Sequence, residues 1–257
     1  MEMNRRKFLK LGTAAVAGVG AAAIAANPAV AATIEGTYKE SAGKRSDVTW
    51  GMVIDMNKMD EATLNECIKA CHSYHNVPDI GNEKDEVKWI WGETFEHLFL
   101  DEVHERMAEQ YKGKTFMTLC NHCEQPVCVR VCPTKATFQN AQGVVGMDMH
   151  RCIGCRNCMA ACPYGARSFN YVDPRKYLEE INPTYPTRMK GVVEKCNFCS
   201  ELIAQGGQPL CAQIAKEAIT FGDINDPNSQ VSKKIAENFT LQRRSNLGTK
   251  PKVYYIL

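Results

Sequence analysis

Short apolar runs, separated by turn-rich stretches, follow a polar segment at residues 32–50 that we interpret as a linker. The run Trp50–Met56 predicts a strand, and Asn65–His72 is expected to end in a helix. Prolines punctuate residues 174–186, which predicts an irregular connection. Four more runs predict strands, the last an apolar tail at the edge of a sheet: Ala141–Met149, Arg167–Asp173, Ala218–Phe221 and Lys252–Leu257.

Residues 84–112 are rich in charge but contain large apolar side chains: Trp89, Trp91, Phe95, Leu98 and Phe99. Their spacing partly suits an amphipathic helix. We interpret the stretch as an insertion. A surface helix that packs on itself is favoured over a segment that covers the core or meets a partner.

The first 31 residues predict an export signal that does not belong to the fold. Asn4–Lys10 contains twin arginines, Leu11–Ala26 is a weakly hydrophobic run, and Ala29–Ala31 is a small-residue cleavage site. This order resembles a Tat signal, with a basic tail or a membrane anchor as the alternative. Export by this signal predicts a location on the outer face of the cytoplasmic membrane, periplasmic or extracytoplasmic. No later apolar run could span a bilayer, so we expect the mature protein to be soluble or peripheral.

The cysteine content adds a metal-binding role to this predicted arrangement of strands and helices. The 257 residues include 13 cysteines, grouped at spacings that favour metal ligation over disulfides. The formal net charge of +2, without any run of Lys and Arg, argues against a nucleic-acid-binding protein. The sequence has no haem-attachment motif, no nucleotide-binding glycine loop and no nucleophile elbow.

Two cysteine runs stand back to back in the middle of the chain, Cys120–Pro133 and Cys152–Pro163. The second follows the bacterial pattern C-x2-C-x2-C-x3-C-P, and the first has two extra residues before its third cysteine. Three thiolates of one loop can bind three irons of a cubane cluster, while the fourth ligates the other cluster of the pair. A zinc site or a disulfide framework is the competing interpretation.

Further cysteines flank this pair: Cys67 and Cys71 upstream, and Cys196, Cys199 and Cys211 downstream. From about residue 50 onward, the order of motifs resembles the periplasmic four-cluster ferredoxin-like subunits of membrane-linked oxidoreductases. The resemblance implies an α+β fold of two pseudo-symmetric dicluster-ferredoxin-like lobes with short strands and helices, plus insertions. It implies an inner lobe at residues 116–175 between two outer parts, at 32–115 and 176–257.

In that family, each cluster takes three cysteines from its own motif and the last cysteine of a partner motif. The resemblance therefore implies three [4Fe-4S] clusters in this chain. The implied ligand sets are Cys120, Cys123, Cys128 and Cys162; Cys152, Cys155, Cys158 and Cys132; and Cys196, Cys199, Cys211 and Cys71.

A fourth site of the family is incomplete here. It would need cysteines where this chain has Glu61, Leu64 and Ala215, so Cys67 alone remains and is predicted to be a free or structural thiol. Rescue of the site by Glu61, Glu66 or a histidine is a weaker alternative, because leucine and alanine cannot bind a metal.

Five polar side chains stand beside the predicted ligands. His122 lies inside a cysteine loop, where a hydrogen-bonding or solvent role is favoured over ligation. Arg130, Arg151, Arg156 and Lys195 would raise the reduction potential of a nearby cluster by offsetting its negative charge. Ordinary solvated surface charge is an equal alternative for each of them.

Clusters ligated wholly by cysteine have no open iron, which implies an electron relay with no substrate site of its own. The twin arginines, the incomplete outer site and the run Pro186–Cys196 most resemble DsrO-type subunits of the Dsr membrane complex of dissimilatory sulfur metabolism. This resemblance implies an NrfD-type quinone-interacting membrane subunit and a multihaem cytochrome c as partners. The alternative is a subunit of a molybdopterin, nitrite or tetrathionate reductase. Two further hypotheses are weaker: an enzyme with an open iron, and a protein that uses its clusters only to hold the fold together.

Overall fold

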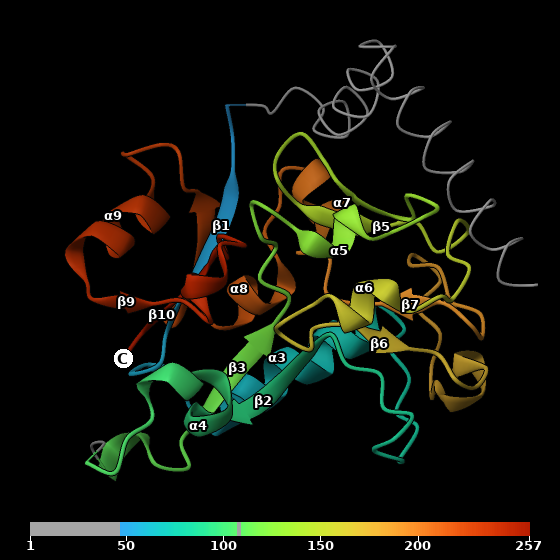
Figure 1. Ribbon diagram of the computed structural model, residues 1–257, viewed down its shortest axis with the longest axis horizontal. Coiled ribbons are helices and arrows are strands. Elements are labelled where there is room, and N and C mark those ends of the chain that lie inside the picture. Colours follow the sequence, from blue (N-terminus) through green and yellow to red (C-terminus); the bar gives the residue numbers. More distant parts are fainter. Residues whose placement is uncertain (1–46, 107–108) are drawn as a thin grey trace, which may run out of the picture. The chain divides into compact units, whose positions relative to one another are not determined.

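The computed structural model describes residues 47–106 and 109–257, which form mixed helices and short strands (Figure 1). The predicted export signal and most of the predicted linker lie outside the described residues. No helix of the described part is both long and apolar enough to cross a membrane.

A four-stranded sheet joins the two ends of the described chain in the order β8-β1-β10-β9. β1 (Trp50–Asp55) pairs in parallel with β10 (Val253–Ile256) and antiparallel with β8 (Ile219–Asp223). The strands expected at Trp50–Met56 and Ala218–Phe221 are therefore confirmed. The tail was expected at an edge, which is wrong, because β9 (Thr240–Leu241) pairs with its outer side.

α3 (Glu61–Tyr74) confirms the helix predicted near Asn65–His72 and begins earlier than expected. The carboxylate of Asp60 accepts a hydrogen bond from Thr63 N at 2.7 Å, which caps the first turn. Leu64, Cys67 and Cys71 recur at helical spacing and form the buried face. This face packs against α8 (Leu210–Ile214), the short helix that carries Cys211.

The described residues of the segment 84–112 do not form the expected amphipathic surface helix. β2 (Ile90–Thr94) pairs antiparallel with β3 (Thr115–Leu119), and the connection contains α4 (Phe95–Leu98), η1 (Leu100–Glu102) and η2 (Glu109–Tyr111). The apolar side chains of the segment lie in the main core, with Trp89 and Leu98 each 1% exposed. Burial in tertiary contacts outweighs the partial helical spacing.

The cysteine motifs lie on short hairpins and single-turn helices. The first run contains α5 (Val127–Arg130) and is followed by the hairpin of β4 (Thr137–Gln139) and β5 (Val145–Met147). The second run contains α6 (Asn157–Ala160) and is followed by β6 (Ser168–Phe169). These confirm the strands expected within Ala141–Met149 and Arg167–Asp173, both shorter than predicted. β6 pairs with β7 (Val193–Glu194), which introduces the last cysteine group and α7 (Ser200–Ala204).

The remaining elements complete the ends of the fold. η3 (Pro174–Tyr177) opens the irregular connection that the prolines predict. α9 (Gln230–Glu237) covers β1 and β8, and η4 (Ser245–Leu247) precedes β10. The division of the chain at residues 115 and 175 stays a prediction.

Candidate metal centre

All thirteen cysteines lie in the described part of the chain, and all are free. Twelve of them line three cavities, four to a cavity. The Cys120 cavity contains Cys120, Cys123, Cys128 and Cys162. The Cys132 cavity contains Cys132, Cys152, Cys155 and Cys158. The outer cavity contains Cys71, Cys196, Cys199 and Cys211.

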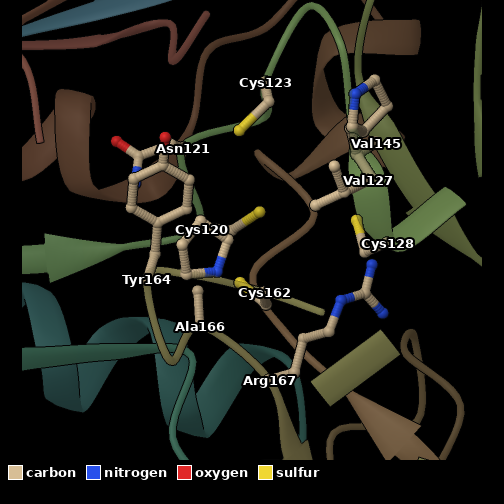
Figure 2. A pocket seen from close by; sticks show the side chains of 12 residues that line it. Cys120, Asn121, Cys123, Val127, Cys128, Val145, Cys162, Tyr164, Ala166 and Arg167 are labelled. Atoms are coloured by element: carbon tan, nitrogen blue, oxygen red, sulfur yellow. The ribbon is translucent and has the colours of Figure 1, made fainter. Parts of the chain in front are cut away.

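The Cys120 cavity is built from the loop after β3, the turn of α5 and the segment after α6 (Figure 2). Figure 2 shows its four sulfurs around a common space, with the guanidinium of Arg167 beside Cys128. Apolar side chains close the walls, among them Val127, Val145 and Ala166. Cysteines 42 residues apart at Cys120 and Cys162 thus meet in one site, because the two motifs cross over.

The Cys132 cavity takes its fourth cysteine from the first central motif. Cys132 follows α5 in the sequence and lines the same cavity as Cys152 and Cys155. The backbone nitrogen of Thr137 lies 3.4 Å from the Cys132 sulfur and donates a hydrogen bond to it. Cys155 is exposed, and Cys132 and Cys152 are partly exposed. This cavity therefore lies nearer the surface than the other two.

The outer cavity joins two parts of the chain that lie more than a hundred residues apart. Cys71 comes from α3, Cys199 precedes α7, and Cys211 belongs to α8. Two backbone N–H groups point at its sulfurs, Phe198 N to Cys196 and Leu210 N to Cys199, each at 3.5 Å. All four of these cysteines are buried.

The three cysteine loops share one unusual backbone position. The residue two places after the first cysteine has a positive φ in each: 42° at His122, 69° at Gly154 and 58° at Phe198. Glycine adopts this conformation freely, whereas histidine and phenylalanine are strained in it. The side-chain rings of His122 and Phe198 stack on each other, with their centroids 3.7 Å apart. His122 is buried and its Nδ1 accepts a hydrogen bond from Val145 N, so the predicted hydrogen-bonding role holds and the solvent role does not.

The cavities follow one another in a row. The outer and Cys120 cavities adjoin, because the Lys195 ammonium group donates to the carbonyl oxygens of Cys196, which lines the first, and of Val145, which lines the second. The Cys120 and Cys132 cavities adjoin as well, because Cys128 of the first and Cys158 of the second pack in one buried cluster. The Cys120 cavity therefore lies between the other two.

Buried cations stand among these cavities. Arg167, Lys195 and Arg243 are each buried, and among the described residues none of them has a carboxylate within ion-pair distance. Burial alone would lower the pKa of Arg167, but the thiolates of Cys128, Cys158 and Cys120 raise it instead. One Arg167 nitrogen and two Arg243 nitrogens have no hydrogen-bond partner. Uncompensated buried cations are costly, so they favour an anionic occupant in the cavities.

These cavities fit a four-iron cluster better than a zinc ion. Four cysteines, N–H groups aimed at sulfur and adjacent cations suit an anionic iron–sulfur cluster. In the part of the chain that the structure describes, no three cysteine sulfurs of one cavity lie within 4.8 Å of one another. A zinc ion bound at about 2.3 Å would draw four sulfurs closer together than this.

Cys67 lines none of these three cavities. It is buried in the main core, and its sulfur lies 3.7 Å from the carbonyl oxygen of Cys211. Leu64 and Ala215, which stand at the family's ligand positions, are also buried there, whereas Glu61 and Glu66 are exposed. The sequence positions of the incomplete fourth site are therefore partly occupied by the packed face of α3.

The structure adds side chains that the sequence pattern did not single out. His75 lines the outer cavity, its Nδ1 lies 2.9 Å from the carbonyl oxygen of Cys71, and its other ring nitrogen contacts Glu201 at 2.8 Å. These two groups and the Cys199 sulfur lie within 4.8 Å of one another. Arg167 was likewise missed. Of the four cations predicted beside ligands, Lys195 alone is buried, while Arg130, Arg151 and Arg156 are exposed.

Comparison with known proteins gives the same chemistry. Two overlapping matches to 4Fe-4S dicluster domain families cover residues 112–176 and 151–214. The chain is 41% identical over 276 residues to the Hdr-like menaquinol oxidoreductase iron-sulfur subunit 1 of Archaeoglobus fulgidus, covering 98% of this chain and 97% of that protein.

Two other relatives carry related descriptions. The menaquinone reductase iron-sulfur cluster-binding subunit of Nitratidesulfovibrio vulgaris is 32% identical over 84% of this chain and 91% of its own length. Protein NrfC of Escherichia coli is 30% identical over 100% of this chain and 96% of its own length. The chain therefore belongs to the family of 4Fe-4S dicluster iron–sulfur subunits that transfer electrons within oxidoreductase complexes.

Proposed function

We propose that the chain holds three [4Fe-4S] clusters and relays single electrons as an exported subunit of a membrane-bound redox complex. The observation that carries the proposal is the grouping of twelve cysteines into three cavities of four. The proposed ligand sets are those of the Cys120, Cys132 and outer cavities. Cys67 takes no part in this scheme.

Each bound cluster would supply reversible one-electron chemistry. The chain's own residues set its environment. Apolar walls exclude water from the Cys120 and outer cavities, and Arg167 and Lys195 offset the negative charge. With all four protein ligands being cysteine, no iron has an open position, which supports a relay without a substrate site of its own.

The location and partners are inferred from the sequence. The twin-arginine segment supports export to the outer face of the cytoplasmic membrane. The resemblance to DsrO-type subunits supports an NrfD-type quinone-interacting subunit and a multihaem cytochrome c as neighbours, with a link to sulfur or sulfite metabolism. The relatives described as menaquinol oxidoreductase and menaquinone reductase subunits are consistent with a quinone-linked complex.

A second candidate keeps the fold and changes the partner. The descriptions of two relatives name a putative dimethyl sulfoxide reductase and a polysulfide reductase. They favour a subunit that transfers electrons to or from a reductase. In that case, the chain would carry electrons for a molybdopterin-dependent, nitrite or tetrathionate enzyme.

Purification from native membranes in mild detergent tests these assignments. A co-purifying integral quinone-binding subunit together with a multihaem cytochrome c supports the first assignment. A co-purifying molybdopterin protein contradicts it and supports the second. EPR-monitored redox titration of the isolated chain tests the relay itself, since clusters that serve as mere staples would not be reduced by quinol analogues or low-potential donors.

A further inference from the structure

We propose that the surface around the Cys132 cavity is a cationic docking site for an acidic redox protein. The proposal rests on the relay function above and names the kind of partner that meets this end of the row. We define the docking surface by four residues: Lys135, Ile153, Cys155 and Arg156.

Exposure distinguishes this end of the row from the other cavities. Cys155 is exposed, whereas every cysteine of the outer cavity is buried and the Cys120 cavity has one partly exposed cysteine, Cys162. Ile153, which lines the Cys132 cavity, is 67% exposed. Ile153 would supply apolar contact area at the centre of an interface with a partner.

Arg156 is fixed in place at the rim of the cavity. Its guanidinium lies 5.4 Å from the Phe169 ring centroid and 5.8 Å from that of Tyr171, and it donates to the Tyr171 hydroxyl at 3.1 Å. It is the one charged residue among those lining the cavity. Stacking leaves its charge facing solvent without a carboxylate partner among the described residues.

A second cation reinforces the same edge. Lys135 is exposed, and its backbone N–H donates to the carbonyl oxygen of Cys132 at 3.3 Å, which keeps it at the rim. Arg151 is nearby in sequence, but it is paired with Asp148 at 3.2 Å. The rim is therefore positive around an apolar centre, and carboxylates on a partner would complement it.

Gly154 holds the apolar centre in position. Its φ of 69° is left-handed, and an added Cβ would lie 2.5 Å from the carbonyl oxygen of Gly191. The loop thus needs glycine here, and this need fixes Ile153 and Cys155 on either side of it.

Stopped-flow kinetics of the cluster-loaded full chain test the proposal. The probes are reduced flavodoxin, a small acidic electron carrier, and a basic cytochrome c as a carrier of opposite charge. The second-order rate constant with flavodoxin should fall as ionic strength rises, and Arg156→Glu should lower it about tenfold at low salt. With the basic cytochrome, Arg156→Glu should instead raise the rate.

Two further variants keep the test decisive. If Arg156→Glu does not fold, Lys135→Glu takes its place and should change both rate constants in the same directions. Lys233→Glu makes the same charge change on α9, on the opposite side of the view in Figure 1, and should leave both rates within about twofold. Equal effects of the Lys233 and Arg156 variants would overturn the docking surface.

Other results separate this proposal from the relay and from a lipid surface. Binding of anionic phospholipid vesicles that depends on Arg156, with no salt effect on flavodoxin, would overturn the choice of a protein partner. If dithionite fails to reduce the clusters, the relay fails. If the clusters are reduced but neither carrier shows a charge preference, the docking proposal fails alone.

Discussion

Lys195 shows how one buried side chain connects two parts of the metal centre. Its ammonium group donates to the carbonyl oxygen of Cys196 at 2.7 Å and to that of Val145, whose side chain lines the Cys120 cavity. A buried cation at this place would stabilise the reduced, more negative state of an adjacent cluster. Its neighbour Cys196 is a proposed ligand, which makes the effect local.

Replacing Lys195 by methionine should therefore lower a reduction potential. With an effective dielectric near 20, the loss of one charge is expected to lower the potential of the nearest cluster by on the order of 50 mV. Redox titration monitored by EPR measures this shift. Lys190→Met is the matched control, since Lys190 is exposed and screened by water. Equal potentials in the Lys195 variant and the native protein would contradict the countercharge role.

At this scale, sequence reasoning predicted the cysteine sets that line the three cavities but not the side chains around them. Cysteine spacing is a strong signal, because one loop must place three sulfurs around one cluster. Nothing in the spacing indicates that His122 and Phe198 stack, since they are 76 positions apart and meet only in the fold. Arg167 and His75 were missed for the same reason, because each approaches its cavity through tertiary packing.

Helix α3 places two cysteines with opposite predicted roles on one face. Cys67 and Cys71 are both buried and lie one turn apart, yet Cys71 alone lines a cysteine cavity. Burial, followed by the nearby Glu66 carboxylate, raises the pKa of the Cys67 thiol to about 11, as suits a neutral core thiol.

The paired variants Cys67→Ala and Cys71→Ala test this difference. Cys67→Ala should retain the full iron content and cost about 1 kcal/mol of stability, the loss of one buried small group. Cys71→Ala should lose about four irons, or convert one cluster to a three-iron form. Iron analysis and EPR of both proteins measure the outcome. Loss of iron from the Cys67 variant would show that the thiol is a ligand.

β10 was expected at an edge but lies inside the sheet. The apolar tail predicted a strand correctly, but an apolar pattern cannot tell how many neighbours a strand has. The two residues of β9 supply the outer neighbour, and Tyr255 is fully buried with its hydroxyl donating to Met117 O at 3.0 Å. The strand therefore connects the sheet to β3 and the main core.

Truncation after Pro251 should consequently abolish folding of the described unit. It removes an interior strand that bears three buried residues, Val253, Tyr255 and Ile256. Soluble yield and cluster absorbance after expression measure the effect. Phe239→Ala, at a residue 78% exposed just before β9, should leave both unchanged. A soluble, cluster-loaded truncated chain would contradict the interior position of β10.

At the scale of the whole molecule, the segment 84–112 shows the limit of pattern reading. Its apolar residues were partly at helical spacing, but Ile90–Thr94 pairs with β3, and Gly92 lies against Leu64 of α3. A Cβ at Gly92 would approach the Leu64 side chain to 3.4 Å and that of Thr115 to 2.7 Å. The segment is thus part of the core beside α3.

The row of cavities has one partly exposed end and one enclosed end. Cys155 lies at the first, and the outer cavity is covered by α3, α8 and the strands β2 and β3. Leu64, Cys67 and Ala215, at sequence positions of the family's fourth site, are packed in the main core. The central claim is therefore a number: three clusters, each held in a cavity of four cysteines.

Iron and acid-labile sulfide per chain test this claim most directly, measured on protein purified without air together with zinc. Three four-iron clusters predict about twelve irons and about twelve sulfides with negligible zinc. About sixteen irons would show that Cys67 and its neighbours still support a fourth cluster. About eight irons, or stoichiometric zinc, would show that one of the cysteine cavities does not hold a cluster.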